Sequence, residues 1–206
     1  MLKDIFHKGV LAPLFLWLLL CTALQASTFD PILVNDDIMP PKEVDKLTQM
    51  GRELYEKTHI PVFLAAVNDL NHTRPIDLIE DIKKNHSTWM LLFFSKHPTS
   101  VNIFTSTDAE KLADIDQILS PLPWRGTIKP VMSPAFSKNE DIKLEVAILN
   151  GYADLVDQVA ASKGISLKSS IGSGSRDTFM LIRWVFYVIL GFAVLQYFHY
   201  KRKRHG

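Results

Sequence analysis

The sequence has a single cysteine, Cys21, which lies in an apolar run near the N-terminus. The residues that follow it therefore offer no disulfide, no thiolate nucleophile and no zinc–thiolate site. The sequence also has no glycine-rich phosphate loop between a strand and a helix, and no serine in a nucleophile elbow. Because no complete set of catalytic residues is present, the sequence favours a protein that is not an enzyme, without deciding between the two.

A strong charge of one sign is also missing, because the formal net charge of the 206 residues is only +1. The charge is unevenly divided along the chain. Residues 27–175 contain fifteen Lys/Arg and twenty Asp/Glu, whereas residues 176–206 contain six basic residues and one acidic residue. An acidic middle argues against a nucleic-acid partner, which requires a basic face on the folded domain.

The first 26 residues have the pattern of a secretory signal peptide. Lys3 and Lys8 supply the positive start, an apolar run from Val10 to Ala23 follows, and Ala26 is a small residue before a cleavage point. An uncleaved signal anchor is the alternative. Either interpretation predicts that the segment after residue 26 is exported.

A second apolar run near the C-terminus predicts a transmembrane helix over residues 178–200. About twenty apolar residues cross a hydrocarbon core of roughly 30 Å. The basic tail at 201–206 would mark the cytoplasmic side by the positive-inside rule. The expected location is therefore the inner (plasma) membrane with a single pass, a periplasmic N-terminal domain over residues 27–164, and a short linker over residues 165–177.

The middle of the chain alternates helix and strand patterns. Continuous apolar runs at 60–67 and 89–94 predict buried strands, and 101–105 predicts the returning strand of a hairpin. Helices are expected from Pro41, from Pro75, over 107–119 with a capping box, and over a long amphipathic segment that ends near Gly164. The predicted fold class is a layered α/β sandwich with a mostly buried mixed sheet that contains one antiparallel hairpin, plus the C-terminal transmembrane helix.

Several local stretches give the chain a resemblance to the TPM domain family. They are Val34-Asn-Asp-Asp37, the segment from Lys57 to Val67, Met90-Leu-Leu-Phe-Phe94, and Thr105-Ser-Thr-Asp-Ala-Glu110 followed by Asp114. The resemblance covers roughly residues 32–163 and implies an exported α/β domain, often with one C-terminal membrane helix. It also implies either an accessory role in a membrane protein complex, or calcium binding and acid phosphatase activity.

Four carboxylates are candidate metal ligands. Asp36 and Asp37 precede the first expected helix, Asp69 follows a strand, and Asp108 follows the hairpin. Ligands gather beyond the carboxyl ends of strands in open α/β sheets, and an oxygen-only set would suit Ca²⁺ or Mg²⁺. The alternative is that Asp108 serves a helix dipole and that Asp69 starts a turn.

Two further features indicate modification or binding. Asn71 lies in the sequon Asn71-His-Thr73 and is a candidate for N-glycosylation. Trp124 and Arg125 form an aromatic–arginine pair of the kind that is enriched at interface hot spots. Packing of Trp124 over the edge of the core is the alternative interpretation of that pair.

The function expected from these features is a membrane-tethered periplasmic accessory module. It would act as a chaperone, assembly or stability factor for an integral membrane protein complex, since the tether would concentrate it near such a partner. The alternative is a divalent-metal-dependent phosphatase of the TPM type, with a metal ion held by the candidate carboxylates.

Overall fold

The computed structural model describes residues 29–70, 73–133, 139–172, 185, 187–192 and 196. In these residues, four strands form one sheet in the order β1-β2-β3-β4. The strands are β1 (Ile32–Asn35), β2 (Val62–Asp69), β3 (Met90–His97) and β4 (Ser100–Thr105). β1, β2 and β3 run parallel to one another, and β4 returns antiparallel along β3 as the second arm of a hairpin.

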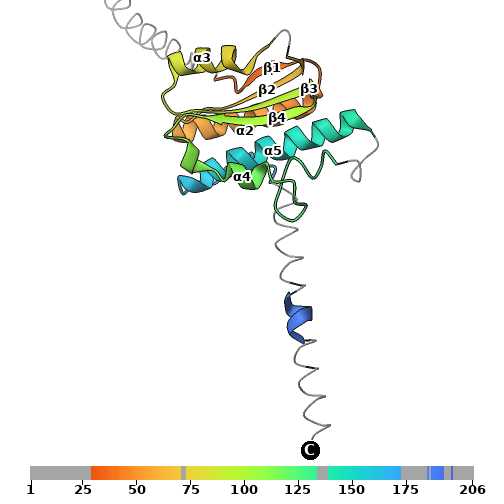
Figure 1. Ribbon diagram of the computed structural model, residues 1–206. Helices are drawn as coiled ribbons and strands as arrows, with labels where there is room; N and C mark the ends of the chain where they lie inside the picture. The colour runs from red at the N-terminus through yellow and green to blue at the C-terminus, as the bar shows by residue number, and fades with distance from the viewer. Residues whose placement is uncertain are drawn as a thin grey trace, which may run out of the picture.

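Helices cover both faces of the sheet, so the domain has three layers (Figure 1). Helices α2 (Pro41–Thr58) and α5 (Glu140–Ser162) lie on one face, and α3 (Pro75–Asn85) lies on the other. The alternation of side chains along β2 explains why its apolar run is continuous. Val62, Leu64 and Ala66 pack toward α2 and α5, whereas Phe63, Ala65 and Val67 pack toward α3.

The architecture is an α/β fold with a four-stranded mixed sheet, and two local elements differ from the sequence-based expectation. β1 was not expected as a strand. The helix expected over 107–119 is divided into the short 3₁₀ helix η1 (Glu110–Leu112) and α4 (Ile115–Ile118). Ala113 between them is extended, and Asp114 caps α4 by accepting a hydrogen bond from the backbone N–H of Gln117. The division sets the direction in which the chain enters the following loop.

The predicted transmembrane helix is corrected by the structure. No helix in the described ranges is both long enough and apolar enough to cross a membrane. This finding contradicts the membrane span in the predicted fold class and the single-pass inner-membrane location. Of residues 178–200, only 185, 187–192 and 196 belong to the described part, and the basic tail at 201–206 and the signal segment at 1–26 lie outside it.

The start of the predicted linker packs on α2 through Glu53. The Glu53 carboxylate accepts hydrogen bonds from the backbone N–H of Lys168 and Ser169, both at 2.8 Å, and from the Ser169 hydroxyl. The Lys57 ammonium donates to Glu53 at 2.7 Å and to the Ser166 carbonyl at 3.0 Å. Leu167 is buried at the same place. These contacts fasten the segment after α5 to the outside of α2.

We call the hydrogen bonds that Glu53 accepts from Lys57, Lys168 and Ser169 the Glu53 clasp. We expect this contact to be sensitive to acid. Burial alone raises the pKa of Glu53, but the hydrogen bonds from Lys57, Ser169 and the Lys168 amide outweigh it and lower the pKa from its usual 4.5 to about 2. The clasp therefore contributes stability above pH 4.5, and that contribution is lost as the pH falls toward 2. Carboxyl ¹³C NMR should find a titration midpoint for Glu53 near 2, and Ser169→Ala should raise it by removing a donor. A midpoint near 4.5 in the unsubstituted protein would show that the clasp does not form.

Candidate protein-binding site

The segment between α4 and α5 carries the Trp124–Arg125 pair on the surface. We call residues 120–127 the Trp124 loop. The side chain of Trp124 is 70% exposed and that of Leu122 is 41% exposed. Trp124 therefore does not pack over the edge of the core, and the alternative interpretation of the pair is wrong. Exposing so much aromatic surface to water is unfavourable, and large exposed aromatic residues often mark binding surfaces.

Backbone hydrogen bonds close the Trp124 loop into a compact turn. The N–H groups of Arg125 and Gly126 both donate to the Leu122 carbonyl, at 2.9 and 2.8 Å. The Thr127 N–H then donates to the Ile118 carbonyl at 3.1 Å, which returns the chain to α4. The loop is thus tied at its tip and at its base.

Gly126 is required by the closeness of this turn. A Cβ atom at position 126 would lie 1.7 Å from the carbonyl oxygen of Ser120, which is backbone and cannot move aside. Any other residue would force the two arms of the loop apart. The Pro121-Leu-Pro123 sequence further limits the backbone, because proline fixes φ near −65°.

A buried carboxylate anchors the base of the loop to α5. Asp154 is fully buried and accepts hydrogen bonds from the Thr127 hydroxyl and from the Gln158 side-chain amide, the latter at 3.0 Å. Leaving such a carboxyl group buried without donors is costly, so Asp154 restricts where Thr127 can lie.

Two glutamines extend this network to the tip of the loop. The side-chain amide of Gln158 donates to the Gln117 side-chain oxygen at 2.8 Å, and Gln117 donates to the Arg125 carbonyl at 2.7 Å. The guanidinium of Arg125 lies 3.9 Å from Asp114, and both side chains are at least half exposed, so this ion pair contributes little. Arg125 is therefore fixed through its backbone, while its charge stays accessible.

Close packing behind the loop completes the attachment. Ile128 presses onto α5 at Gly151, where an added Cβ would lie 2.4 Å from the Ile128 δ-carbon. Gly151 therefore makes room for Ile128, and α5 continues through this position from Glu140 to Ser162. The Trp124 loop is held to α5 by polar contacts at Asp154 and by apolar contacts at Gly151.

The sequence pointed to Trp124 and Arg125 but not to the residues that position them. Asp154 and Gln158 could have been found from helical spacing. Ala147, Gly151 and Asp154 recur at three and four residues and are buried, and the half-buried Gln158 follows four residues after Asp154 on the same side of α5. A carboxylate on a buried helical face needs donors from another element, and a nearby loop rich in proline is a reasonable source.

The candidate metal ligands do not come together. Asp69 pairs in register with His97 at the end of β3, whereas Thr105 pairs with Met90 at its beginning. Strands rise about 3.3 Å per residue, so the two ends of β3 are roughly 23 Å apart. Asp108 follows β4 and lies at the beginning of β3, far from Asp69. Asp108 and Asp69 each follow a strand, but β4 is antiparallel, so its carboxyl end lies at the opposite edge of the sheet from the carboxyl end of β2.

The other two candidate carboxylates, Asp36 and Asp37, lie in the turn that follows β1. Asp36 accepts a hydrogen bond from the Asn68 backbone N–H at 3.0 Å and so ties the end of β1 to β2. Asp37 adopts a positive φ of 55° in the turn that follows. No group of three or more His, Cys, Asp or Glu residues in the described ranges could hold a metal ion. Binding of Ca²⁺ or Mg²⁺ stays a prediction from the resemblance.

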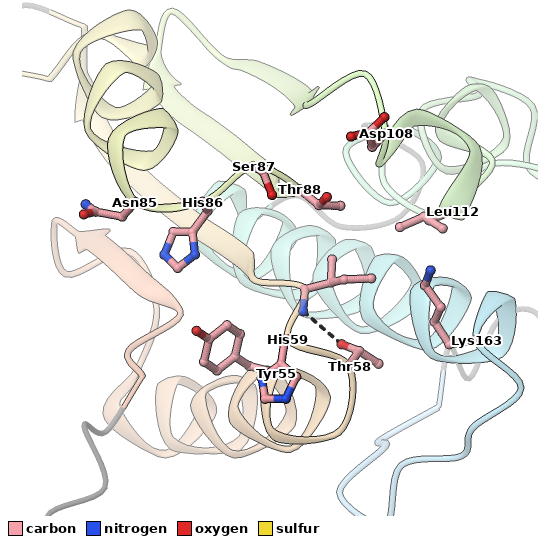
Figure 2. Close-up of a pocket in the computed structure, with 11 residues that line it drawn as sticks. Tyr55, Thr58, His59, Asn85, His86, Ser87, Thr88, Asp108, Leu112 and Lys163 are labelled. Carbon is pink, nitrogen blue, oxygen red and sulfur yellow. Dashed lines mark hydrogen bonds between the residues drawn. The ribbon is translucent and has the colours of Figure 1, made fainter.

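Asp108 instead lines a hollow of about 490 Å³ at the beginning of β2 and β3. Figure 2 shows Tyr55, His59 and His86 on one side of this hollow and Asp108 and Lys163 on the other. The His86 and Tyr55 rings meet edge to face with centroids 6.1 Å apart, and burial lowers the pKa of His86. Neutral His86 packs as an aromatic ring, which gives it a structural role in this hollow.

Comparison with known proteins does not add to the site. No protein-family model matches the chain, and no curated protein matches it in sequence. The resemblance to the TPM family therefore stays a prediction. Asn71, the candidate for glycosylation, lies outside the described residues.

The buried Asp154 contact predicts a large effect from a small change. Thr127→Val keeps the shape of the side chain but removes the hydroxyl donor to Asp154. We expect the free energy of unfolding to fall by about 1–3 kcal/mol, because a buried acceptor loses a donor. Urea denaturation measures this change. The control Thr107→Val makes the same chemical change at an exposed position and should stay within about 0.5 kcal/mol. Equal effects at both positions would show that the contact with Asp154 contributes no net stability.

Proposed function

We propose that this α/β domain is a protein-binding accessory module that supports the assembly or stability of a protein complex, and that Trp124 anchors its partner. The observation that carries this proposal is a largely exposed tryptophan on a loop that is tied down by several independent contacts. A flexible loop would become ordered on binding at a cost of about 0.5–1.5 kcal/mol per immobilised side chain. The attachment of this loop lowers that cost before a partner arrives.

The chemistry of the loop suits a protein partner. Tryptophan and arginine are the residues most enriched at interface hot spots, and both are exposed here beside the partly exposed Leu122. Trp124 would enter an apolar pocket on the partner, and Arg125 would meet a carboxylate or a backbone carbonyl at its rim. The hydrogen bonds of the Arg125 N–H and carbonyl fix its backbone, so its guanidinium group extends from a fixed position.

The alternative of a divalent-metal phosphatase has less support. Such an enzyme requires several oxygen ligands around one point. Asp108 lies at the opposite end of the sheet from Asp69, and the Asp36 carboxylate already receives the Asn68 amide. The accessory binding role is therefore the function that we propose.

Replacement of Trp124 tests the proposal. The full chain carrying a photoreactive group in the Trp124 loop is crosslinked in extracts of its source cells, and the captured protein is identified and purified. We expect Trp124→Ala to weaken its binding by about 2–4 kcal/mol, measured by calorimetry, because hot-spot residues have this magnitude. The free energy of unfolding should change by less than about 0.5 kcal/mol, since the indole is exposed.

The matched control is Ile76→Ala, which removes a 50% exposed apolar side chain from α3 on the other face of the sheet. It should leave the affinity unchanged. A partner that binds Trp124→Ala as tightly as the unsubstituted chain would rule out Trp124 as the anchor. Equal losses in both variants would indicate a general apolar surface effect.

A further inference from the structure

The outer edge of β4 carries backbone groups that no described residue pairs with. The Ser106 N–H donates to the Trp89 carbonyl at 3.0 Å, and the Met90 N–H donates to the Pro61 carbonyl at the start of β2. Backbone groups alternate in direction along a strand, so the N–H and C=O groups of Ser100, Asn102 and Phe104 face β3. Those of Val101, Ile103 and Thr105 point away from the sheet.

Nothing within the described part of the chain pairs with these outward groups. Neither the backbone hydrogen bonds outside the sheet ladders nor the side-chain hydrogen bonds include the N–H or C=O of Val101, Ile103 or Thr105. We call this row the β4 edge. A row of unpaired edge groups is a template onto which another extended chain can pair.

β4 also lacks the features that normally block pairing at an edge. Ser100-Val-Asn-Ile-Phe-Thr105 contains no charge and no proline, and its register with β3 is continuous. The opposite edge strand, β1, has only four residues, and its register shifts between Ile32 and Val34. Short length and irregularity protect an edge from pairing, so β1 is protected where β4 is not.

A hollow of about 370 Å³ lies beside the β4 edge. Val101 and Met132 contribute apolar walls, and Lys129 contributes an exposed ammonium group. Lys129 makes no ion pair or hydrogen bond through its side chain with any described residue. A strand added to the β4 edge would continue the sheet, and every second side chain of it would point to the side on which Val101 packs.

We propose that the β4 edge binds an extended segment of a partner protein as a fifth strand, with a carboxylate side chain of that segment in the hollow beside Lys129. The backbone groups of Val101, Ile103 and Thr105 would supply affinity, and the hollow would supply specificity, as in other cases of strand addition. The neutral β4 strand fits a partner segment of alternating apolar and polar residues. The positive charge of Lys129 selects an acidic residue within it. This inference rests on the proposed protein-binding function and assigns it a second surface.

The probe is a phage-displayed library of random linear peptides selected against the full chain. Enriched peptides should share an alternating apolar pattern with one acidic residue. Two-dimensional NMR with a synthetic enriched peptide should shift the amide signals of Val101, Ile103 and Thr105 most strongly. Enrichment of such peptides together with these amide shifts would support the proposal. Failure to enrich any peptide, or shifts that map to another surface, would overturn it.

Two variants separate the parts of the proposed contact. Ile103→Pro removes an outward N–H without removing a hydrogen bond to β3, and it should weaken peptide binding about tenfold, which is the equivalent of about one lost hydrogen bond. Lys129→Glu changes an exposed side chain and should weaken binding of acidic peptides at least tenfold while binding of lysine-substituted peptides improves. Should Ile103→Pro fail to fold, Lys129→Glu and the NMR shifts still decide. Unchanged affinity in the variants that fold would overturn the proposal.

Two outcomes distinguish this inference from the function proposed for the Trp124 loop. A partner that loses affinity in Trp124→Ala but not in Ile103→Pro or Lys129→Glu would leave the proposed function standing and overturn the β4 proposal. Shifts of the β4 amides that depend on protein concentration without peptide would show that a second copy of the chain occupies the edge, and they would also overturn it.

Discussion

The buried carboxylate of Asp154 determines how the long loop of this domain can fold. A buried polar group without hydrogen-bond partners is costly, which favours structures that keep Thr127 and Gln158 within hydrogen-bonding distance of this carboxyl group. Gln158 also donates a hydrogen bond to Gln117, and Gln117 donates one to the Arg125 carbonyl. The position of Asp154 thereby restricts the backbone of the loop. The backbone next to the exposed Trp124 is therefore positioned by a chain of hydrogen bonds that ends at the buried Asp154.

The layers of the fold explain why this constraint matters for binding. α5 packs against α2 and the sheet along most of its length, which makes it a firm support. The segment that joins α4 to α5 contains the Trp124 loop and also contributes Lys129, Met132 and Ser133 to the hollow beside β4. Residues 127–133 run from the base of the Trp124 loop into the wall of the hollow, with Ile128 buried and Val131 and Met132 packed against the core. The α4–α5 segment, which packs on α5, therefore contributes to both the Trp124 loop and the hollow beside β4.

β2 and β3 could be predicted from the apolar runs at 60–67 and 89–94, because a strand covered on both faces is apolar at successive positions. β1 could not, since it has four residues and only partial burial. The helix expected over 107–119 is interrupted because Asp114 offers a local cap that competes with a continuous helix. The hairpin that precedes Asp108 is visible in the sequence, and because its second strand is antiparallel, Asp108 lies at the opposite edge of the sheet from Asp69. Trp124 could be selected by residue type, whereas the support from Asp154 depends on a contact between residues 27 positions apart in the chain.

The most direct test of this account is the ¹⁵N relaxation of the backbone amides of Leu122, Trp124, Arg125, Gly126 and Thr127. The hydrogen bonds to Leu122, Ile118 and Asp154 predict order parameters near 0.85, the value of a rigid backbone. Thr127→Val should lower these values while α5 keeps its own. Order parameters below about 0.6 in the unsubstituted protein would show a mobile loop, and the claim that Asp154 holds Trp124 ready for a partner would then be contradicted.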